Sequence, residues 1–387
     1  GKIIDKSYSV FRKKNVVDLV KIGDRYVLEL FHGPTLAFKD IAMQLLGNFY
    51  DYHLNNENEK INIVVATSGD TGAAAIDAIK GKKNVNIFVL HPNNRVSPVQ
   101  RRLMTTVGES NVFNIAIEGN FDDCQNLVKA MFADRSFSNE IKMSGVNSIN
   151  WARIIAQSVY YFYSYFLIDD KSKPINFSVP TGNFGDVYAG YLAKKIGLPV
   201  DKFIVATNQN DILHRAISNG DYNVENVLET ISPSMDIQIA SNFERLIYDL
   251  NDQNDNKTID VMKRIKEIGK YKIYKENLDK INVNFLSSRM DENEVLDTIK
   301  TVYEKFDKVL DPHSAIGYGA FDKVNLKGNN IVLATAHPCK FPGAIKKAIN
   351  IKAELPDKLA FILNEKENYD IIENDLNKIK QHIKERI

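Results

Sequence analysis

One lysine of this sequence stands where its amine can act as a nucleophile. Lys39 follows a Gly33-Pro34-Thr35 turn inside an otherwise apolar run and comes just before a helical pattern over residues 41–50. Burial lowers the pKa of a lysine because it disfavours the ammonium form, and the neutral amine is both a nucleophile and a proton carrier. Such an amine forms a Schiff base with a carbonyl cofactor. The alternative is an ordinary helix-start lysine whose ammonium reaches solvent.

A second candidate site is a loop suited to hold a phosphate. After the apolar run 175–179 the chain reads Pro180-Thr181-Gly182-Asn183-Phe184-Gly185-Asp186, and a helical pattern over 187–196 follows, closed by Gly197. Glycines let backbone N–H groups converge, and a helix N-terminus adds partial positive charge, so the loop predicts an anion cradle. It matches neither the Walker motif nor the dinucleotide fingerprint. Many such turns carry glycines for conformational reasons alone. Together with Lys39, however, the loop predicts a cofactor with an aldehyde and a phosphate, pyridoxal 5'-phosphate.

Composition excludes several classes of protein. A chain of 387 residues predicts about two domains, and 44% hydrophobic with 26% charged residues is typical of a soluble globular protein. A net charge of +1 favours neither nucleic acid nor a membrane as a partner. Cys124 and Cys339 have no metal or redox spacing, so we expect reduced structural cysteines and no metal site. No apolar run reaches membrane-spanning length and the start is not a signal peptide, which predicts a cytoplasmic protein.

The elements that must position these residues alternate between strand and helix. Apolar runs predict strands at 61–67, 85–90, 112–117, 175–179, 203–207 and 331–335, with helical patterns such as 122–133 and 151–166 between most of them. Short buried strands joined through helices predict an α/β fold with parallel sheets. Ligands bind beyond the carboxyl ends of such strands. The unusual loops 68–72, 182–185 and 336–340 all follow predicted strands.

Two stretches are predicted to be peripheral. Residues 251–307 are rich in Asn, Lys, Asp and Glu, and we expect a mostly helical insertion there. The tail from Leu355 to Ile387 is expected to form surface helix, and the Arg101-Arg102 pair to be solvated on a helix face.

With these residues assembled, the chain resembles the threonine synthases, a family of fold-type-II pyridoxal-phosphate enzymes with a tryptophan synthase β-like fold. The resemblance covers nearly the whole length. Its motifs are His32-Gly33-Pro34-Thr35-Leu36-Ala37-Phe38-Lys39-Asp40, Ala66-Thr67-Ser68-Gly69-Asp70-Thr71-Gly72, Arg95-Val96-Ser97-Pro98-Val99-Gln100, Asn147-Ser148-Ile149-Asn150-Trp151-Ala152-Arg153, Thr181-Gly182-Asn183-Phe184-Gly185 and Ala334-Thr335-Ala336-His337-Pro338. Members usually carry a further N-terminal segment of several tens of residues, and this chain starts inside the shared pattern.

The resemblance implies a reaction and the cofactor's partners. It implies a carbon–oxygen lyase acting on phosphates, which turns O-phospho-L-homoserine and water into L-threonine and phosphate through a pyridoxal-phosphate aldimine. Lys39 matches the lysine of that aldimine. Thr335 matches the hydroxyl that faces the pyridine nitrogen, where a neutral group moderates the electron sink; without the resemblance it would be an ordinary strand residue. The cofactor phosphate is assigned to the loop of Gly182, Asn183, Phe184 and Gly185.

The resemblance also implies the residues that bind substrate. Ser68 and Thr71 suit the α-carboxylate, because their loop precedes a helix N-terminus. Asp70 falls near the cofactor's phenolic oxygen, and a helix N-cap is an equally good alternative for it. The substrate phosphate is assigned to Asn147, Ser148 and Arg153, since an arginine fork suits phosphate; the alternative for Arg153 is a surface helix residue. His313 and His337 are expected to be structural.

We expect a large domain of residues 1–45 plus 156–387 and a small mobile domain, 46–155, that closes over the substrate. The expected partner is the small-molecule substrate, on a monomer or homodimer. One alternative is a related phospholyase that releases phosphate from another O-phospho amino acid and yields a keto acid. Another is a non-catalytic binding relative, which is disfavoured because the lysine and the glycine cradle are both present. A nucleotide-binding Rossmann protein is disfavoured because no acidic ribose partner follows a glycine fingerprint.

Overall fold

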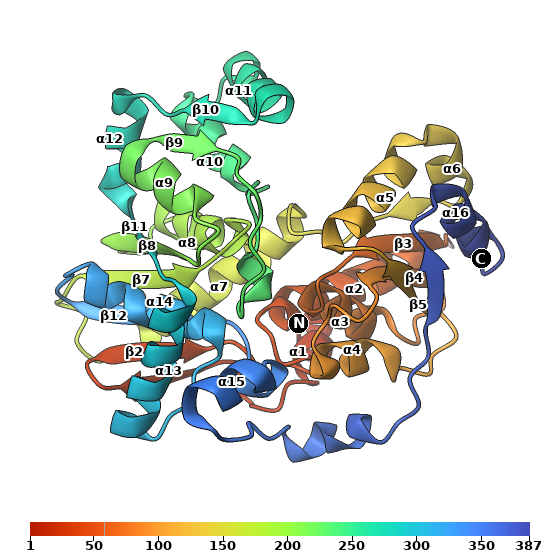
Figure 1. The fold of residues 1–387 in the computed structure, drawn as a ribbon, viewed down its shortest axis with the longest axis horizontal. Helices are drawn as coiled ribbons and strands as arrows, with labels where there is room; N and C mark the ends of the chain where they lie inside the picture. The colour runs from red at the N-terminus through yellow and green to blue at the C-terminus, as the bar shows by residue number, and fades with distance from the viewer. Residues whose placement is uncertain (58) are drawn as a thin grey trace. The chain divides into compact units, whose positions relative to one another are not determined.

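The computed structural model describes residues 1–57 and 59–387, which form two compact units (Figure 1). Unit 1 comprises Gly1–Val16, His32–Asn150 and Glu354–Ile387, and unit 2 comprises Val17–Phe31 and Trp151–Ala353. Each unit has its own sheet flanked by helices, so the predicted α/β class is confirmed. None of the helices in the described ranges combines the length and apolar character needed to cross a membrane.

The sheet of unit 1 is parallel throughout, with strand order β13-β5-β4-β3-β6. The strands are β3 (Ile61–Ala66), β4 (Val85–Pro92), β5 (Val112–Glu118), β6 (Met143–Ser144) and β13 (Asp370–Glu373). The helices are α1 (Lys2–Tyr8), α2 (Lys39–Glu57), α3 (Asp70–Ile79), α4 (Pro98–Thr105), α5 (Phe121–Ala133), α6 (Arg135–Glu140), α16 (Leu376–Lys384) and the 3-10 helix η3 (Asp357–Leu363).

The main sheet of unit 2 has the order β1-β2-β12-β7-β8-β11 and is parallel except for the β1–β2 hairpin. The strands of unit 2 are β1 (Asp18–Ile22), β2 (Arg25–Glu29), β7 (Ile175–Pro180), β8 (Lys202–Thr207), β9 (Asp221–Asn223), β10 (Lys270–Lys272), β11 (Phe285–Arg289) and β12 (Asn329–Ala334). Its helices are α7 (Trp151–Leu167), α8 (Gly185–Lys195), α9 (Ile212–Asn219), α10 (Phe243–Leu250), α11 (Asp255–Ile268), α12 (Lys275–Asn284), α13 (Glu292–Phe306), α14 (Pro312–Lys323) and α15 (Pro342–Ile349), with 3-10 turns η1 (Pro233–Met235) and η2 (Pro338–Lys340).

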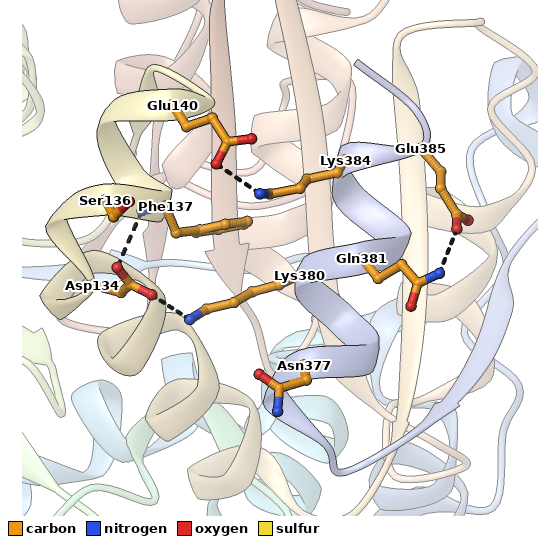
Figure 2. Close-up of a pocket in the computed structure, with 9 residues that line it drawn as sticks. All are labelled: Asp134, Ser136, Phe137, Glu140, Asn377, Lys380, Gln381, Lys384 and Glu385. Atoms are coloured by element: carbon orange, nitrogen blue, oxygen red, sulfur yellow. Dashed lines mark hydrogen bonds and ion pairs between the residues drawn. The ribbon is translucent and has the colours of Figure 1, made fainter.

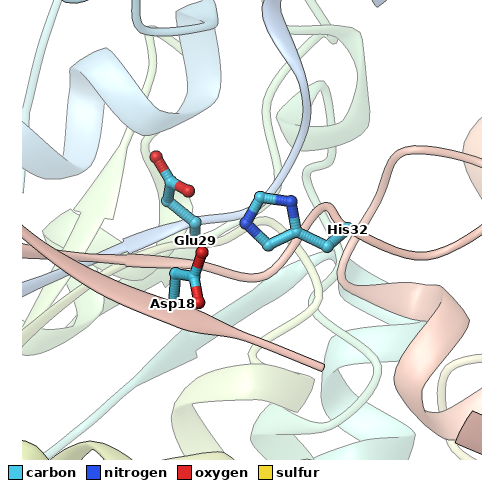
Figure 3. Close-up of side chains that lie close together, drawn as sticks. All are labelled: Asp18, Glu29 and His32. Carbon is cyan, nitrogen blue, oxygen red and sulfur yellow. The ribbon is translucent and has the colours of Figure 1, made fainter. Parts of the chain in front are cut away.

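The strands predicted from apolar runs all form, with ends within one or two residues of those expected. The β1–β2 hairpin was missed, although Gly23-Asp24 between two short apolar-rich runs is a recognisable two-residue turn signal. Figure 3 shows the carboxylates of Asp18 and Glu29, which stand opposite each other in the hairpin register, together with His32, where the chain passes into unit 1.

The two units do not follow the predicted division into 1–45 plus 156–387 and 46–155. Helix α2, which begins at Lys39, belongs to unit 1 because it packs closely on α3. Gly47 faces the backbone of Ala78 with no room for a Cβ, and Gln44 Nε2 donates to Asp77 Oδ2 at 2.6 Å. Which part of the chain moves during turnover stays a prediction.

The C-terminal tail is not simply surface helix. Strand β13 pairs with β5, and the following α16 buries Ile379 and Ile383 in the core of unit 1. Arg101 Nε and Nη2 donate to Glu367 at 2.7 and 3.0 Å, and Arg102 Nη1 donates to the carbonyl of Ile362 at 2.8 Å. The expectation that this arginine pair is solvated was therefore wrong, because both side chains hold the tail.

The expected insertion at 251–307 is only partly peripheral. It is mostly helical, but its strand β11 forms the edge of the main sheet of unit 2, parallel to β8. Val295, Ile299 and Val302 of α13 lie in the core of that unit. A strand only five residues long among polar neighbours carries little pattern of its own, so its place depends on pairing with β8.

A groove of about 440 Å³ separates α6 from α16 within unit 1 (Figure 2). Lys380 pairs with Asp134 and Lys384 with Glu140, each at 2.6 Å, and both ammonium groups lie near the ring of Phe137. Because these charges neutralise one another across the groove, we interpret it as the seam that holds the C-terminal helix.

Ile383→Ala is expected to lower the free energy of unfolding of unit 1 by about 2–5 kcal/mol, because this fully buried side chain leaves a cavity. Urea unfolding measures the change. Ile371→Ala, in the same tail but 56% exposed, is the control and should cost less than about 1 kcal/mol. Equal losses for the two variants would show that α16 does not contribute to the core.

Candidate functional site

Lys39 is the first residue of α2, and its ammonium does not reach out to solvent. Its Nζ lies 3.0 Å from Asp70 Oδ2, and the side chain is 12% exposed. The ring of Phe38 lies 4.9 Å from the same nitrogen. The alternative of a solvated helix-start lysine is therefore wrong. The amine forms an ion pair with Asp70 that is largely shielded from solvent.

The turn before Lys39 is fixed by the residue after it. Asp40 is fully buried and accepts hydrogen bonds from the Thr35 N–H at 2.8 Å and the Thr35 hydroxyl at 2.5 Å. Gly33 lies so close to the Asp40 side chain that no Cβ fits there, and Arg12 Nη1 donates to the Gly33 carbonyl at 2.8 Å. The Gly-Pro-Thr turn thus folds around a carboxylate and sets where Lys39 begins its helix.

Asp70 is positioned to hold Lys39 and does not cap its own helix. Its second oxygen, Oδ1, accepts a hydrogen bond from Gln100 Nε2 at 2.8 Å. The N-cap of α3 is Gly69, with φ 133°, so the N-cap alternative for Asp70 was wrong. Gln100 had no role in the sequence-based prediction, although it ends one of the quoted motifs.

The loop between β3 and α3 is closed by Thr67. Its Oγ1 accepts from the N–H groups of Gly69 and Gly72, at 2.9 and 2.8 Å. These two N–H groups are thus hydrogen-bonded within the loop. The side chains of Ser68 and Thr71, which carry the hydroxyls of this loop, are half-buried. Any anion that binds here would meet those hydroxyls.

Asn147 and Ser148 lie near the end of the segment His32–Asn150 of unit 1, and Arg153 lies in the first turn of α7, in unit 2. Asn147 is exposed and Ser148 half-buried, and the carbonyl of Asn147 accepts from the N–H of Asn150 at 3.1 Å. These residues therefore lie in a turn that is at least partly exposed to solvent.

The predicted phosphate loop lies between β7 and α8, as expected. Phe184, in the left-handed region at φ 62°, is the N-cap of α8, and its N–H donates to Thr181 Oγ1 at 3.0 Å. Asn183 is held from a neighbouring segment, because its carbonyl accepts from the Asn242 N–H at 3.1 Å and its Oδ1 from the Ser241 hydroxyl at 3.3 Å. The loop is thus a braced strand-to-helix turn with the shape of an anion cradle.

Both cradle glycines lie where a Cβ would make a tight contact with a neighbouring segment. A Cβ on Gly182 would be 3.0 Å from Met235 Cα, a backbone atom, and a Cβ on Gly185 would be 3.1 Å from Asn242 Nδ2. Asn242 is fully buried and was missed by the sequence reasoning, because no local pattern distinguishes it. The close backbone approach and the nearby amide fit a phosphate group.

Arg153 is a buried residue of α7 and not a surface helix residue, 3% exposed. Burial lowers the pKa of Arg153 to about 10, and the nearby Tyr160 opposes this, so the guanidinium remains charged near neutral pH. The Tyr160 hydroxyl donates to the carboxylate of Asp186, and the Tyr161 hydroxyl donates to the same oxygen at 3.0 Å. Burial raises the pKa of both tyrosines well above the ordinary value, so they stay protonated donors.

Thr335 follows β12, buried, with its N–H donating to Ser314 Oγ at 3.2 Å. The two histidines kept out of the catalytic set have local partners. His313 Nδ1 lies 2.8 Å from Asp311 Oδ1, and His337 Nδ1 lies 3.0 Å from Cys339 Sγ.

The described site residues therefore divide between the units. Unit 1 contains Lys39, Ser68, Asp70, Thr71, Asn147 and Ser148, and unit 2 contains Arg153, Gly182, Asn183, Phe184, Gly185 and Thr335. Within unit 1 the structure joins Lys39 to Asp70 directly.

Comparison with known proteins identifies the family. Residues 20–271 match the family described as "Pyridoxal-phosphate dependent enzyme", and residues 314–383 match "Threonine synthase, C-terminal". A threonine synthase of Pseudomonas aeruginosa is 46% identical over 386 residues, covering 99% of this chain and 82% of the relative. That of Saccharomyces cerevisiae is 42% identical, covering 100% of this chain and 83% of the relative.

The solved structure of a pyridoxal-phosphate-bound threonine synthase from Brucella melitensis superposes with a TM-score of 0.95 at 46% identity, covering 100% of this chain and 83% of that one. Identity at this level over nearly the whole length agrees with the site chemistry of Lys39 and the glycine cradle. The chain belongs to the threonine synthase family of fold-type-II, pyridoxal-phosphate-dependent enzymes.

Proposed function

We propose that this protein converts O-phospho-L-homoserine and water to L-threonine and phosphate, with pyridoxal 5'-phosphate as cofactor. The observation that carries the proposal is the mostly buried amine of Lys39, held 3.0 Å from Asp70 at the centre of the motif 32–40 on which the resemblance rests. A lysine in this position has the chemistry of a carbonyl-binding amine and a proton carrier.

The residues of unit 2 fit the cofactor. Pyridoxal phosphate, when bound, supplies an aldehyde that condenses with amines and a conjugated ring that withdraws electrons from bonds at the substrate's Cα and Cβ. The loop of Gly182, Asn183, Phe184 and Gly185 would hold its phosphate. Its two glycines lie where the loop backbone packs closely against neighbouring segments. The Thr335 hydroxyl would face the pyridine nitrogen and leave it largely unprotonated.

Lys39 would hold the aldehyde carbon and then move protons at the substrate's Cα and Cβ. Asp70 accepts from the Lys39 ammonium and from Gln100, so it keeps the amine in place between proton transfers. A carboxylate near the cofactor's phenolic oxygen would share a proton with it.

Substrate recognition would use a different group of residues. Arg153, Asn147 and Ser148 would bind the substrate phosphate, which must be held while its bond to carbon breaks. Ser68 and Thr71 would bind the α-carboxylate through their hydroxyls. Water would then be added at Cβ.

Gly182→Ala is expected to weaken pyridoxal-phosphate binding by roughly ten- to a hundredfold, because its Cβ would press on the Met235 backbone and displace the loop from the phosphate. Gly182→Val should be worse. The dissociation constant is measured by reconstituting the full-length protein with the cofactor. Gly343→Ala is a matched control in the same unit, since open space surrounds that position. An unchanged affinity in Gly182→Val would place the phosphate elsewhere.

The reaction itself is tested with O-phospho-L-homoserine. The purified protein should be yellow and release equal amounts of phosphate and threonine. Release of phosphate with a keto acid instead of threonine would support the related phospholyase. A colourless protein that takes up no cofactor would support a non-catalytic binding relative.

We further propose that the protein works in the cytoplasm, as a monomer or homodimer, without a nucleic-acid partner. The near-zero net charge and the small-molecule chemistry of the site support this. Size-exclusion chromatography with light scattering distinguishes the two assembly states.

A further inference from the structure

We propose that Asp311 is a positioning residue that sets both ends of the cofactor site in unit 2. Through Ser314 it holds the backbone of Thr335. Through His313 it holds Ser234 and Met235, whose backbone is the wall against which Gly182 packs. This inference rests on the proposed roles of Thr335 and Gly182 in cofactor binding. It concerns residues that contact neither substrate nor cofactor in the proposed function.

Asp311 is a buried carboxylate, 1% exposed, at the N-terminus of α14. Oδ1 accepts the N–H of His313 at 3.0 Å and lies 2.8 Å from His313 Nδ1. Oδ2 accepts the N–H of Ser314 at 3.1 Å and also the Ser314 hydroxyl. An ionised carboxylate only accepts hydrogen bonds, so both partner side chains must be donors toward it.

Because His313 and Ser314 donate to Asp311, each has an acceptor atom left for a second hydrogen bond. The proton of His313 lies on Nδ1, which leaves Nε2 as an acceptor, and Nε2 receives the N–H of Ser234 at 3.2 Å. The hydroxyl proton of Ser314 points to Asp311, so its Oγ has lone pairs for the Thr335 N–H at 3.2 Å. One carboxylate therefore determines the polarity of two hydrogen-bond chains.

The His313 chain ends at the phosphate cradle. Ser234 and Met235 belong to η1, and their backbone is the wall against Gly182: a Cβ there would lie 3.0 Å from Met235 Cα and 3.2 Å from the Ser234 carbonyl oxygen. The position of this wall therefore limits where the Gly182 backbone can lie. It thereby also positions the backbone N–H groups of the cradle loop.

The wall formed by Ser234 and Met235 belongs to a loop with several internal hydrogen bonds. Asp236, next to η1, accepts from the Thr230 hydroxyl at 2.7 Å, the Thr230 N–H at 2.8 Å and Asn208 Nδ2 at 2.8 Å. The loop 230–236 is thus braced internally by hydrogen bonds. Its bond to His313, whose ring packs on Phe341, ties the loop to α14.

The Ser314 chain ends at Thr335, the residue that would face the pyridine nitrogen. Thr335 lies just past β12, where the hydrogen bond from its backbone N–H to Ser314 Oγ holds the backbone that carries the threonine side chain. Packing alone would be served by apolar residues at His313 and Ser314. A neutral imidazole and a hydroxyl around one carboxylate therefore indicate that His313 and Ser314 act through directed hydrogen bonds.

Two substitutions at His313 separate hydrogen bonding from packing. The amide of His313→Asn reaches only to the place of Nδ1, while the longer His313→Gln places a carbonyl oxygen near Nε2 and can accept from Ser234. Losing a buried hydrogen bond corresponds to roughly ten- to a hundredfold in affinity. We expect His313→Asn to raise the Kd for pyridoxal phosphate about tenfold or more, and His313→Gln to stay within about threefold of the unaltered protein.

The serine arm has a spectroscopic readout. Ser314→Ala should shift the visible absorption band of the bound cofactor, because the Thr335 hydroxyl is no longer held toward the pyridine nitrogen, and should leave the Kd within about threefold. Asp311→Asn should change both the Kd and the band. Asparagine caps helices as well as aspartate does, so this variant is expected to fold. Since Asp311 acts on the cradle through His313, the double variant Asp311→Asn/His313→Asn should bind no more weakly than the poorer single variant.

Equal Kd values for His313→Asn and His313→Gln, with an unshifted band in Ser314→Ala, would overturn the inference. Additive losses in the double variant would also count against it. The proposed reaction fails differently, as a protein that binds pyridoxal phosphate but makes no threonine. In that case the affinity comparison at His313 still decides whether Asp311 positions the cradle.

Discussion

Lys39→Ala is expected to abolish threonine formation, lowering kcat by at least about a thousandfold while the fold survives. The substitution removes the amine that we propose binds the cofactor's carbonyl and carries protons at the substrate. In unit 1, Asp70 accepts a hydrogen bond from this amine at 3.0 Å. Steady-state release of threonine and phosphate measures the loss, and circular dichroism checks the fold.

Lys39→Arg is the stricter test of the same assignment. Arginine keeps a positive charge for Asp70, which avoids leaving a buried carboxylate without its cation, yet it cannot form the carbonyl linkage. We expect it to be as inactive as Lys39→Ala. Lys82 is the matched control: its side chain is 13% exposed against 12% for Lys39, and it contacts Asp51 and Asn48.

Lys82→Ala should therefore retain activity. In the unaltered protein, borohydride reduction followed by peptide mapping should find the cofactor attached to Lys39. Appreciable threonine formation by either Lys39 variant, or attachment to another lysine, would remove Lys39 from its assigned role.

Arg153→Leu should leave cofactor binding intact but cripple the use of O-phospho-L-homoserine. A charge-assisted hydrogen bond is worth about 1.5–3 kcal/mol, or roughly ten- to a hundredfold, and a bidentate pair gives more. Because the leaving phosphate must be held as its bond breaks, we expect the loss in kcat as well as KM. Burial lowers the pKa of Arg153 only to about 10, so the charge is present at neutral pH.

Phosphate inhibition separates this role from a structural one. Inorganic phosphate should inhibit the unaltered enzyme competitively and the Arg153→Leu variant much less, and Arg153→Lys should recover only part of the activity because a point charge lacks the planar fork. Arg215→Leu is the control in the same unit, since Arg215 pairs with Asp211 at 2.8 Å and Asp221 at 3.0 Å. Equal phosphate inhibition of the unaltered enzyme and Arg153→Leu would direct the search to Arg95 or Lys340.

The central strands and the motif loops could be predicted from the sequence for a physical reason. Strands buried on both faces of a parallel sheet are rich in apolar and β-branched residues, so 61–67 and 175–179 are recognisable from the sequence although each contains polar residues. Lys39 and the Gly182–Gly185 loop are recognisable for a similar reason, because a nucleophilic amine and a close backbone approach each require particular residue types at particular turns.

Only the tertiary structure decided the contacts between distant segments. Strand β13 is four residues long and mostly exposed, and it exists because its backbone pairs with β5 across the fold. Gln100 on Asp70, Asn242 beside Gly185 and Asp311 behind Thr335 look like ordinary polar residues in the chain. Their roles come from neighbours brought together by folding, and a local pattern carries no information about partners that lie far away along the chain.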